Sequence, residues 1–312
     1  MNEKVINFYK HRNIYFIISI CIILTGIISA LTGGIKLDIQ FQGGSILKYS
    51  YTGTIVSKDA GDIVESALGR TADCQEQTNM VKSNQMLIVN LAGNESITPE
   101  EQKTVTDTLT KAYPDVNLRL SESLSVQPFT GARFFRNGIL AILISFLLIL
   151  VYVGFRFKNI GGFSAATMAI IALFHDAFVI TTAFIVFKIP LNDTYIAAIL
   201  SILGFSVNDT IVIYDRIREN KKLLGPKTPT DYLVNLSITQ SLTRSINTNI
   251  AVFVSITIAF IFSQVYNIES IKDFALPMMF GTISGCYSTI CIAGPLWTMW
   301  KNHRAKANLK KA

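Results

Sequence analysis

Six long runs of apolar residues divide the chain, and each approaches the ~20 residues that a helix needs to cross a bilayer. The predicted spans cover residues 14–34, 135–155, 163–187, 194–214, 246–264 and 275–299. The first run follows Lys10 and Arg12, as in a signal peptide, but it is too long for one and lacks a clear small-x-small cleavage motif. We therefore expect a retained membrane anchor.

Residues 35–133 form one sizeable polar stretch, and their pattern predicts an α+β domain outside the membrane. Alternating residues predict strands, and capping residues predict where two helices begin or end. The expected elements are strand Ser45–Tyr51, a helix capped by Ser57 and ended by Gly69, strands Ala72–Val81 and Gln85–Leu91, a helix from the cap Thr98 to about Tyr113, and strand Val116–Val126. This βαββαβ order is typical of a ferredoxin-like fold. The domain shows no active-site motif, so we expect a binding or lever module.

The predicted fold class is an α-helical polytopic membrane protein with six transmembrane helices and one extracytoplasmic α+β domain. Residues 1–34 hold the N-terminus and the first helix, 35–133 the α+β domain, and 134–312 the other five helices and a basic tail. The long connection 215–243 carries leucines that alternate with polar residues after Thr230, a pattern that predicts an interfacial amphipathic helix leading into the fifth span.

Charge indicates the orientation of these helices. Half of the residues are hydrophobic and 16% are charged, against about a quarter in soluble proteins. With the N-terminus inside, the inner segments carry sixteen Lys or Arg residues, and the short outer loops carry Lys188 and Lys272. This positive-inside asymmetry predicts cytoplasmic termini. The basic stretch Arg216–Lys222 is either a solvated topology determinant or a contact for anionic lipid, and no basic soluble face suggests nucleic-acid binding.

Three predicted spans carry stripes of small and polar residues at helical spacing, which let helices approach closely and pair their polar groups. The stripes are Ala165, Ala169, Ala172, Asp176 and Ala183 in the third span, Ala197, Ser201, Gly204 and Asn208 beside Asp209 in the fourth, and Arg244, Asn247, Thr248, Ala251 and Ser255 in the fifth. Hydrogen bonding between packed helices accounts for the Ala, Ser and Thr positions.

Asp209 needs a further explanation, because a carboxylate in hydrocarbon costs about 2.5–3.5 kcal/mol and requires a partner or a polar cavity. Unlike an amide, it can bind and release a proton, and a nearby arginine modulates that exchange. Arg244 is the candidate, although an arginine at the inner end of a helix also follows the positive-inside rule. We predict a proton path through Asp209 and Arg244 with Asn208, Asn247 and Thr248, and a Na⁺ path would use the same residue types.

Asp176 also belongs to the predicted path, and with His175 it forms either a second relay point or a hydrogen-bonded strut. A proton that crosses the membrane potential yields about 2.3 kcal/mol per 100 mV, enough to bias a hinged outer domain between two positions. The sequence has no phosphate-binding loop, no nucleophile–His–acid set and no metal-ligand spacing. We therefore expect a non-enzyme without metal or cofactor, coupled to H⁺ or Na⁺.

Residues 206–219, SVNDTIVIYDRIRE, resemble the signature of the SecF family, accessory subunits of the bacterial Sec translocon. Two further blocks are similar to the family pattern. One runs from GFSA at 162–165 to the His-Asp pair, and the other from NLSI at 235–238 to RSINT at 244–248. The resemblance covers the six-helix layout and nearly the whole chain.

The resemblance implies a multi-pass subunit of the bacterial cytoplasmic membrane that pairs with SecD in an assembly of the resistance–nodulation–division type. Such a complex uses the proton-motive force to help unfolded preproteins cross through SecYEG, with YidC and YajC as further partners and membrane lipids around it. In that family, the acid at the position of Asp209 and the arginine at the position of Arg244 belong to the proton path.

The chain departs from the family pattern at the borders of the outer domain. Family members commonly carry Asp-Phe-x-Gly-Gly after the first helix, where this chain has Gln40-Phe41-Gln42-Gly43-Gly44, and Gly-Pro before the second, where it has Gln127-Pro128. Gly43 and Gly44 serve either a turn or close strand approach, or a hinge of the outer domain.

Two other functions stay open at this point. One is half of a small-molecule or lipid exporter of the resistance–nodulation–division type, and the other is a membrane scaffold. Such exporters usually carry two six-helix halves in one chain, so a single half with one outer loop of ~100 residues favours an obligate partner.

Overall fold

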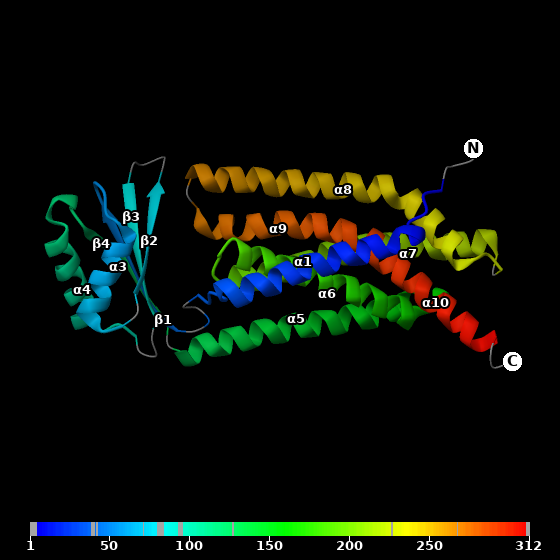
Figure 1. Cartoon of the computed structure of the whole chain (residues 1–312), viewed down its shortest axis with the longest axis horizontal. Coiled ribbons are helices and arrows are strands. Elements are labelled where there is room, and N and C mark those ends of the chain that lie inside the picture. The colour runs from blue at the N-terminus through cyan, green and yellow to red at the C-terminus, as the bar shows by residue number, and fades with distance from the viewer. Residues whose placement is uncertain are drawn as a thin grey trace.

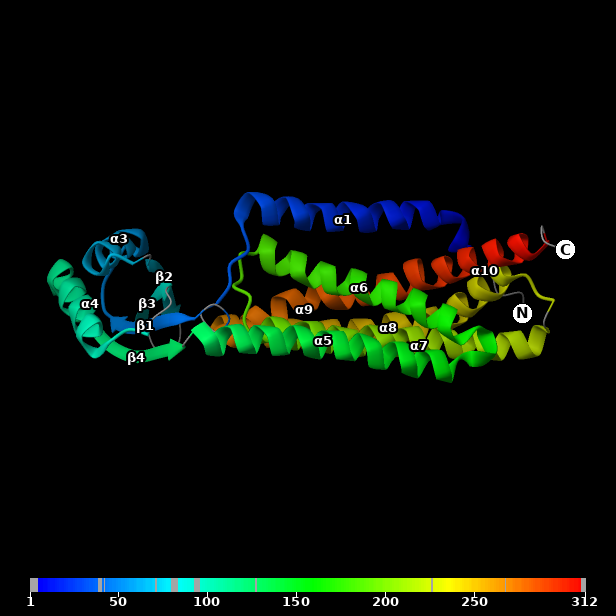
Figure 2. The same cartoon turned by 90° about the horizontal axis from the view of Figure 1, so that it is seen from below.

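Figures 1 and 2 show an elongated molecule in which long helices run side by side and a small α+β domain lies beyond one end of them. The computed structural model describes residues 5–38, 41, 43–70, 72–79, 84–92, 96–126, 128–225, 227–266 and 268–309. Within these residues, six helical stretches are long and apolar enough to cross a membrane: Tyr9–Gly33, Gly131–Arg156, Gly162–Val186, Asp193–Leu224, Thr230–Tyr266 and Ser270–Ala307. These stretches confirm the six predicted spans.

The helical body begins and ends at the side away from the α+β domain (Figure 1). Its elements are the 3₁₀ turn η1 (Tyr9–His11), α1 (Arg12–Gly33), α5 (Pro128–Arg156), the 3₁₀ turn η3 (Lys158–Ile160), α6 (Gly162–Val186), α7 (Asp193–Leu224), α8 (Thr230–Tyr266), α9 (Glu269–Ser288), the π-helical turn η4 (Thr289–Ala293) and α10 (Gly294–Leu309). The π-helical turn interrupts the last stretch, and such turns are frequent near functional sites.

The α+β domain holds a four-stranded antiparallel sheet of order β2-β3-β1-β4. Its elements are β1 (Gly44–Tyr51), α3 (Ser57–Leu68), β2 (Ala72–Asn79), β3 (Asn84–Ala92), α4 (Pro99–Ala112), the 3₁₀ turn η2 (Pro114–Val116) and β4 (Arg119–Val126). Helices α3 and α4 lie on one face of the sheet (Figure 2). Leu47, Tyr49, Val64, Leu87 and Leu109 form the core between these layers. The predicted βαββαβ fold is confirmed.

Two local predictions about this domain are wrong. Ser57 is the first helical residue, and the N-cap position belongs to Val56, whose side chain has no hydrogen-bonding atom. The last strand begins at Arg119, because the chain first makes the turn η2 and then places Asn117 in the left-handed region at φ 47°. The predicted end of the second strand, at Val81, lies outside the described residues.

The predicted cap of the second domain helix is confirmed. Thr98 Oγ1 accepts a hydrogen bond from the Glu101 N–H at 3.2 Å, and the Glu101 carboxylate accepts one from the Thr98 N–H at 2.9 Å. Because the backbone donor favours the ionised acid, it holds the pKa of Glu101 below its usual value. This capping box fixes the start of α4.

The predicted amphipathic helix is the start of α8 and leads directly into the fifth span. Helix α7 also continues past the predicted span, to Leu224. The apolar side chains of this region pack on the N-terminal segment and on α10, in a buried cluster that includes Phe8, Leu233, Ile238 and Trp297. Protein contacts therefore cover apolar side chains that the sequence pattern assigned to the lipid surface.

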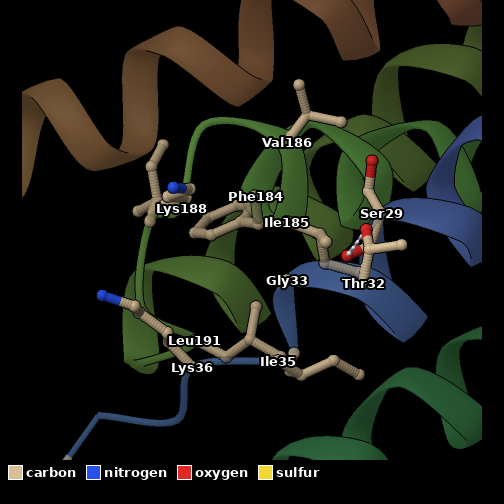
Figure 3. A pocket seen from close by; sticks show the side chains of 12 residues that line it. Ser29, Thr32, Gly33, Ile35, Lys36, Phe184, Ile185, Val186, Lys188 and Leu191 are labelled. Atoms are coloured by element: carbon tan, nitrogen blue, oxygen red, sulfur yellow. Dashed lines mark hydrogen bonds between the residues drawn. The ribbon is translucent and has the colours of Figure 1, made fainter.

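The segment that enters the α+β domain is attached to the helical body. Asp38 N donates to Leu191 O at 3.0 Å, and Leu191 N donates to Lys36 O at 2.9 Å, which pairs this segment with the α6–α7 loop. Phe41 is buried, and its ring centroid lies 5.2 Å from that of Phe135 in α5. Figure 3 shows the small pocket that the end of α1 and the α6–α7 loop form at this place.

Gly43 and Gly44 lead from this segment into β1. Their φ angles of 81° and 141° lie in the region that favours glycine. Gly44 pairs with Ala92 and Val126 in the sheet. The backbone therefore needs glycine here for the entry into β1, and the hinge role stays a prediction. The departures at Gln40 and Gln127 lie outside the described residues.

Candidate functional site

Asp176 is completely buried in the middle of α6 and connects three helices. Ser206 Oγ of α7 and Ser288 Oγ of α9 donate to Asp176 Oδ2 at 2.6 and 2.7 Å. Ser284 Oγ of α9 donates to Oδ1 at 2.6 Å, and His175 Nδ1 lies 3.3 Å from the same oxygen. We call these five residues the Asp176 cluster. Three hydroxyl groups from two neighbouring helices thus converge on one carboxyl group.

No lysine or arginine among the described residues forms an ion pair with Asp176 within 4.0 Å. The serine hydroxyl groups supply its hydrogen bonds. One turn further, Thr289 of the π-helical turn lies 3.2 Å from Thr210 Oγ1 and donates to Ser206 O at 3.4 Å. A polar seam therefore runs between α6, α7 and α9 through an apolar interior.

Asp209 lies on α7 one helical turn from Ser206 and is 6% exposed. Asn249 Nδ2 of α8 donates to Asp209 Oδ2 at 2.5 Å, and it also contacts Ser245 O at 2.8 Å. The Arg244 guanidinium acts electrostatically on the Asp209 carboxyl group, although no ion pair within 4.0 Å joins them in the described chain. Asp209 therefore has an amide partner and a nearby cation.

An open cavity of about 630 Å³ lies between α7 and α8. Arg244 and Asn208 line it, and the rest of its lining is largely polar or charged: Asp215, Arg216, Arg218, Glu219, Lys222, Gln240 and Ser241. A cavity of this size with charged walls is large enough for water. The buried Asp209 side chain is thus one residue away from a hydrophilic cavity on the side opposite the α+β domain.

The three predicted stripes differ in their exposure. The stripe of α6 is buried, with Ala165, Ala169 and Ala172 at 0% exposure. The stripes of α7 and α8 lie largely on the surface of the chain, with Ala197, Gly204, Asn208, Arg244, Asn247, Thr248, Ala251 and Ser255 all exposed. We call the exposed stripes of α7 and α8 the polar face.

The structure brings together only part of the predicted path. Asp209, Asn208 and Arg244 gather beside the cavity, whereas Asn247 and Thr248 make no side-chain hydrogen bond within the described residues. Asp176 belongs to its own cluster with His175, one turn of α7 away from Asp209.

Sequence reasoning missed the residues that hold these acids in place: Ser206, Ser284, Ser288 and Asn249. A signal existed for two of them, because Ser284 and Ser288 are four residues apart and so share one face of an apolar span. Which acid they would meet depended on tertiary packing.

A sequence profile described as "Protein export membrane protein SecD/SecF, C-terminal" matches residues 104–303, which include both buried acids. The chain belongs to the SecD/SecF family. Among SecD/SecF proteins, protein translocase subunit SecF of Alicyclobacillus acidocaldarius is 31% identical over 94% of this chain and 92% of that protein. SecF of Borreliella burgdorferi is 33% identical, over 94% of this chain and 97% of that protein.

Longer SecDF proteins contain a part similar to this chain. Protein translocase subunit SecDF of Bacillus subtilis is 32% identical over 96% of this chain, which spans 39% of its length. The crystal structure of SecDF from Thermus thermophilus matches with a TM-score of 0.78 at 26% identity, over 96% of this chain and 39% of that one. A SecDF structure in a super-membrane-facing form matches with a TM-score of 0.70 over the whole chain and 41% of its own length. Family membership and six apolar helices make this chain a multi-pass membrane protein.

Proposed function

We propose that the chain acts with SecD as a subunit of a complex that uses the proton-motive force to assist protein translocation across the bacterial cytoplasmic membrane. One observation carries the proposal: Asp209 is 6% exposed inside a membrane span, and the adjacent residue Asn208 lines a polar cavity together with Arg244. Ionisable groups in such positions mark ion pathways. The relatives are named protein translocase subunits, which supports protein as the transported class of molecule.

In this proposal, Asp209 exchanges the proton and Arg244 senses its charge. The cavity between α7 and α8 connects the pair to the basic end of the bundle, which we assign to the cytoplasm with both termini. Asn249 orients the carboxyl group through its 2.5 Å hydrogen bond. The role is mechanical and not catalytic, and the coupling ion is H⁺, with Na⁺ as the alternative that experiment separates.

The polar face supports a partner of the same membrane-spanning kind. Exposed Asn247, Thr248 and Arg244 would be costly against lipid, whereas a second helical half can pair with them. The small residues Ala197 and Gly204 on the same face allow close helix approach. The SecDF relatives carry both names in one chain, and we therefore assign this face to SecD.

We further propose that the complex works at SecYEG, with YidC and YajC as neighbours, and that the α+β domain contacts unfolded preprotein outside the membrane. Shifts in the Asp209 region would reach this domain along the helices that enter and leave it, α1 and α5. The paired backbone at Lys36 and Leu191 ties the domain entry to the α6–α7 loop and so offers a mechanical connection.

A pulse-chase of a secreted preprotein tests this function in cells that produce Asp209→Asn at the wild-type level together with SecD. We expect precursor to accumulate, because the amide cannot exchange a proton. Asp193→Asn serves as the control, since it changes an exposed acid on the same helix and should leave export normal. Normal export with Asp209→Asn would refute the proposal. A protonophore and a Na⁺ ionophore, applied separately, identify the coupling ion.

A further inference from the structure

A half-open apolar groove of about 410 Å³ lies between α1, α6 and α9. Ile22 of α1, Ala183 of α6 and Phe280 of α9 form its walls. Its polar lining consists of His175, Thr182, Ser284 and Tyr287. The volume falls in the range of small-molecule sites, and the lining carries no acid, lysine or arginine.

Helix α1 contacts the walls of the groove at two places. Toward the end with the termini, Tyr287 Oη donates to Tyr15 O at 2.5 Å and lies 3.2 Å from Ser19 Oγ. Toward the α+β domain, α1 touches α6 at Gly26, where an added Cβ would overlap Thr182 Oγ1. Thr182 itself lines the groove, so this contact lies within the length of the groove.

The groove has the depth of one bilayer leaflet. Along α6 it extends from His175 to Phe187 just past the helix end, and these twelve residue steps correspond to a rise of about 18 Å. Half of the ~30 Å hydrocarbon core is about 15 Å. At mid-membrane the groove reaches the ring of His175, which is 6% exposed and whose Nε2 has no hydrogen-bond partner among the described residues.

Positive charge lies at the end of the groove nearer the α+β domain. Val186 lines both the groove and the pocket shown in Figure 3. In that pocket Lys36 and Lys188 lie on the side opposite Ser29 and Thr32 (Figure 3). Both lysines are exposed, and neither forms an ion pair within 4.0 Å with a described residue. An anionic phosphate group complements two such cations.

We propose that this site binds one glycerophospholipid from the leaflet on the side of the α+β domain, with an acyl chain in the groove and its phosphate at Lys36 and Lys188. The apolar groove, which is as deep as one leaflet, binds the acyl chain, and the two lysines bind the headgroup. The methyl end of the acyl chain covers His175 and so separates the Asp176 cluster from the bilayer. The inference does not depend on the transport proposal.

Photo-crosslinking of the full chain in nanodiscs tests the site directly. The probes are two phosphatidylglycerols that carry a diazirine either at the terminal carbon of one acyl chain or next to its ester. The terminal probe should label peptides that contain His175 or Tyr287, and the ester-proximal probe should label the peptide around Phe187. Equal labelling by both probes, or labelling confined to other helices, would overturn the proposal.

Native mass spectrometry of purified full chains then separates the two halves of the site. Ala183→Phe fills the groove and should abolish the retained phosphatidylglycerol, whereas Leu148→Phe on the exposed side of α5 should keep it. The double variant Lys36→Gln and Lys188→Gln should weaken the binding of phosphatidylglycerol several-fold and leave the binding of diacylglycerol unchanged. Lys272→Gln is the matched control. If Ala183→Phe does not fold, Ile22→Phe fills the same groove from α1. Full retention in a folded groove variant would contradict the assignment.

Discussion

At the scale of single residues, the two buried acids differ in what surrounds them. Asp176 is at 0% exposure and has three serine donors from α7 and α9, so its hydrogen-bonding capacity is used within the protein. Asp209 has one amide partner and a cation nearby, and a polar cavity begins at the next residue. We infer that Asp176 holds the helices together and that Asp209 is the group able to exchange a proton.

The serine donors of Asp176 should each contribute to stability. Ser288→Ala removes one of the two hydroxyl groups that donate to Asp176 Oδ2, the other being that of Ser206, and should lower the free energy of unfolding by about 0.5–1.5 kcal/mol. Ser255→Ala is the control, because Ser255 is exposed and bonds only to Ala251 O of its own helix. Denaturant titration of the purified proteins measures both. Equal stability of the two variants would contradict the role of Ser288.

These residue contacts mark the limit of prediction from sequence. Asp209 and Asp176 stand out because a carboxyl group is costly within an apolar run. Their partners Ser206, Ser288 and Asn249 are common residue types in membrane helices, so nothing local separates them from packing residues. Only the register between α6, α7 and α9, with the π-helical turn, decides which hydroxyl group meets which acid.

At the scale of helices and strands, periodicity predicted most of the fold because burial and period agree. Apolar runs of bilayer length became spans, and alternation within the domain became strands. The errors occurred at boundaries. Val56 took the cap position before Ser57, and a turn delayed β4 to Arg119. The sequence pattern predicted a lipid contact for the apolar face at the start of α8, because local periodicity does not reveal that Trp297 and Phe8 pack against this face.

The capping box of α4 should make the start of that helix sensitive to acid. The hydrogen bond from the Thr98 N–H lowers the pKa of Glu101 in the folded chain from its ordinary value of 4.5. The ionised Glu101 therefore stabilises the start of α4 fully above the pKa of the unfolded chain, and this stabilisation is lost as the pH falls through the pKa of the folded chain. Hydrogen exchange of residues 99–112 should show faster opening in Glu101→Gln than in the wild type at pH ~7, and a much smaller difference at pH ~3. A difference that is independent of pH would contradict the assignment.

At the scale of the whole molecule, the polar face of α7 and α8 is the surface that we propose pairs with SecD. Gly204 is exposed, and an added Cβ would meet no atom within 4 Å, so Gly204→Leu should leave the chain folded. It should nevertheless reduce the SecD that copurifies with the chain, because the larger side chain blocks close helix approach. Phe205→Leu, an exposed change on the next residue, is the control. Undiminished SecD with Gly204→Leu would place the partner elsewhere.

In the whole complex, we propose that proton exchange at Asp209 drives protein translocation. The most direct measurement is preprotein translocation into inverted membrane vesicles that contain SecD and this chain, with and without an imposed pH gradient. The wild type and Asp193→Asn should respond to the gradient, and Asp209→Asn should translocate at the same rate with and without it. An Asp209→Asn protein that keeps the full response to the gradient would contradict the account.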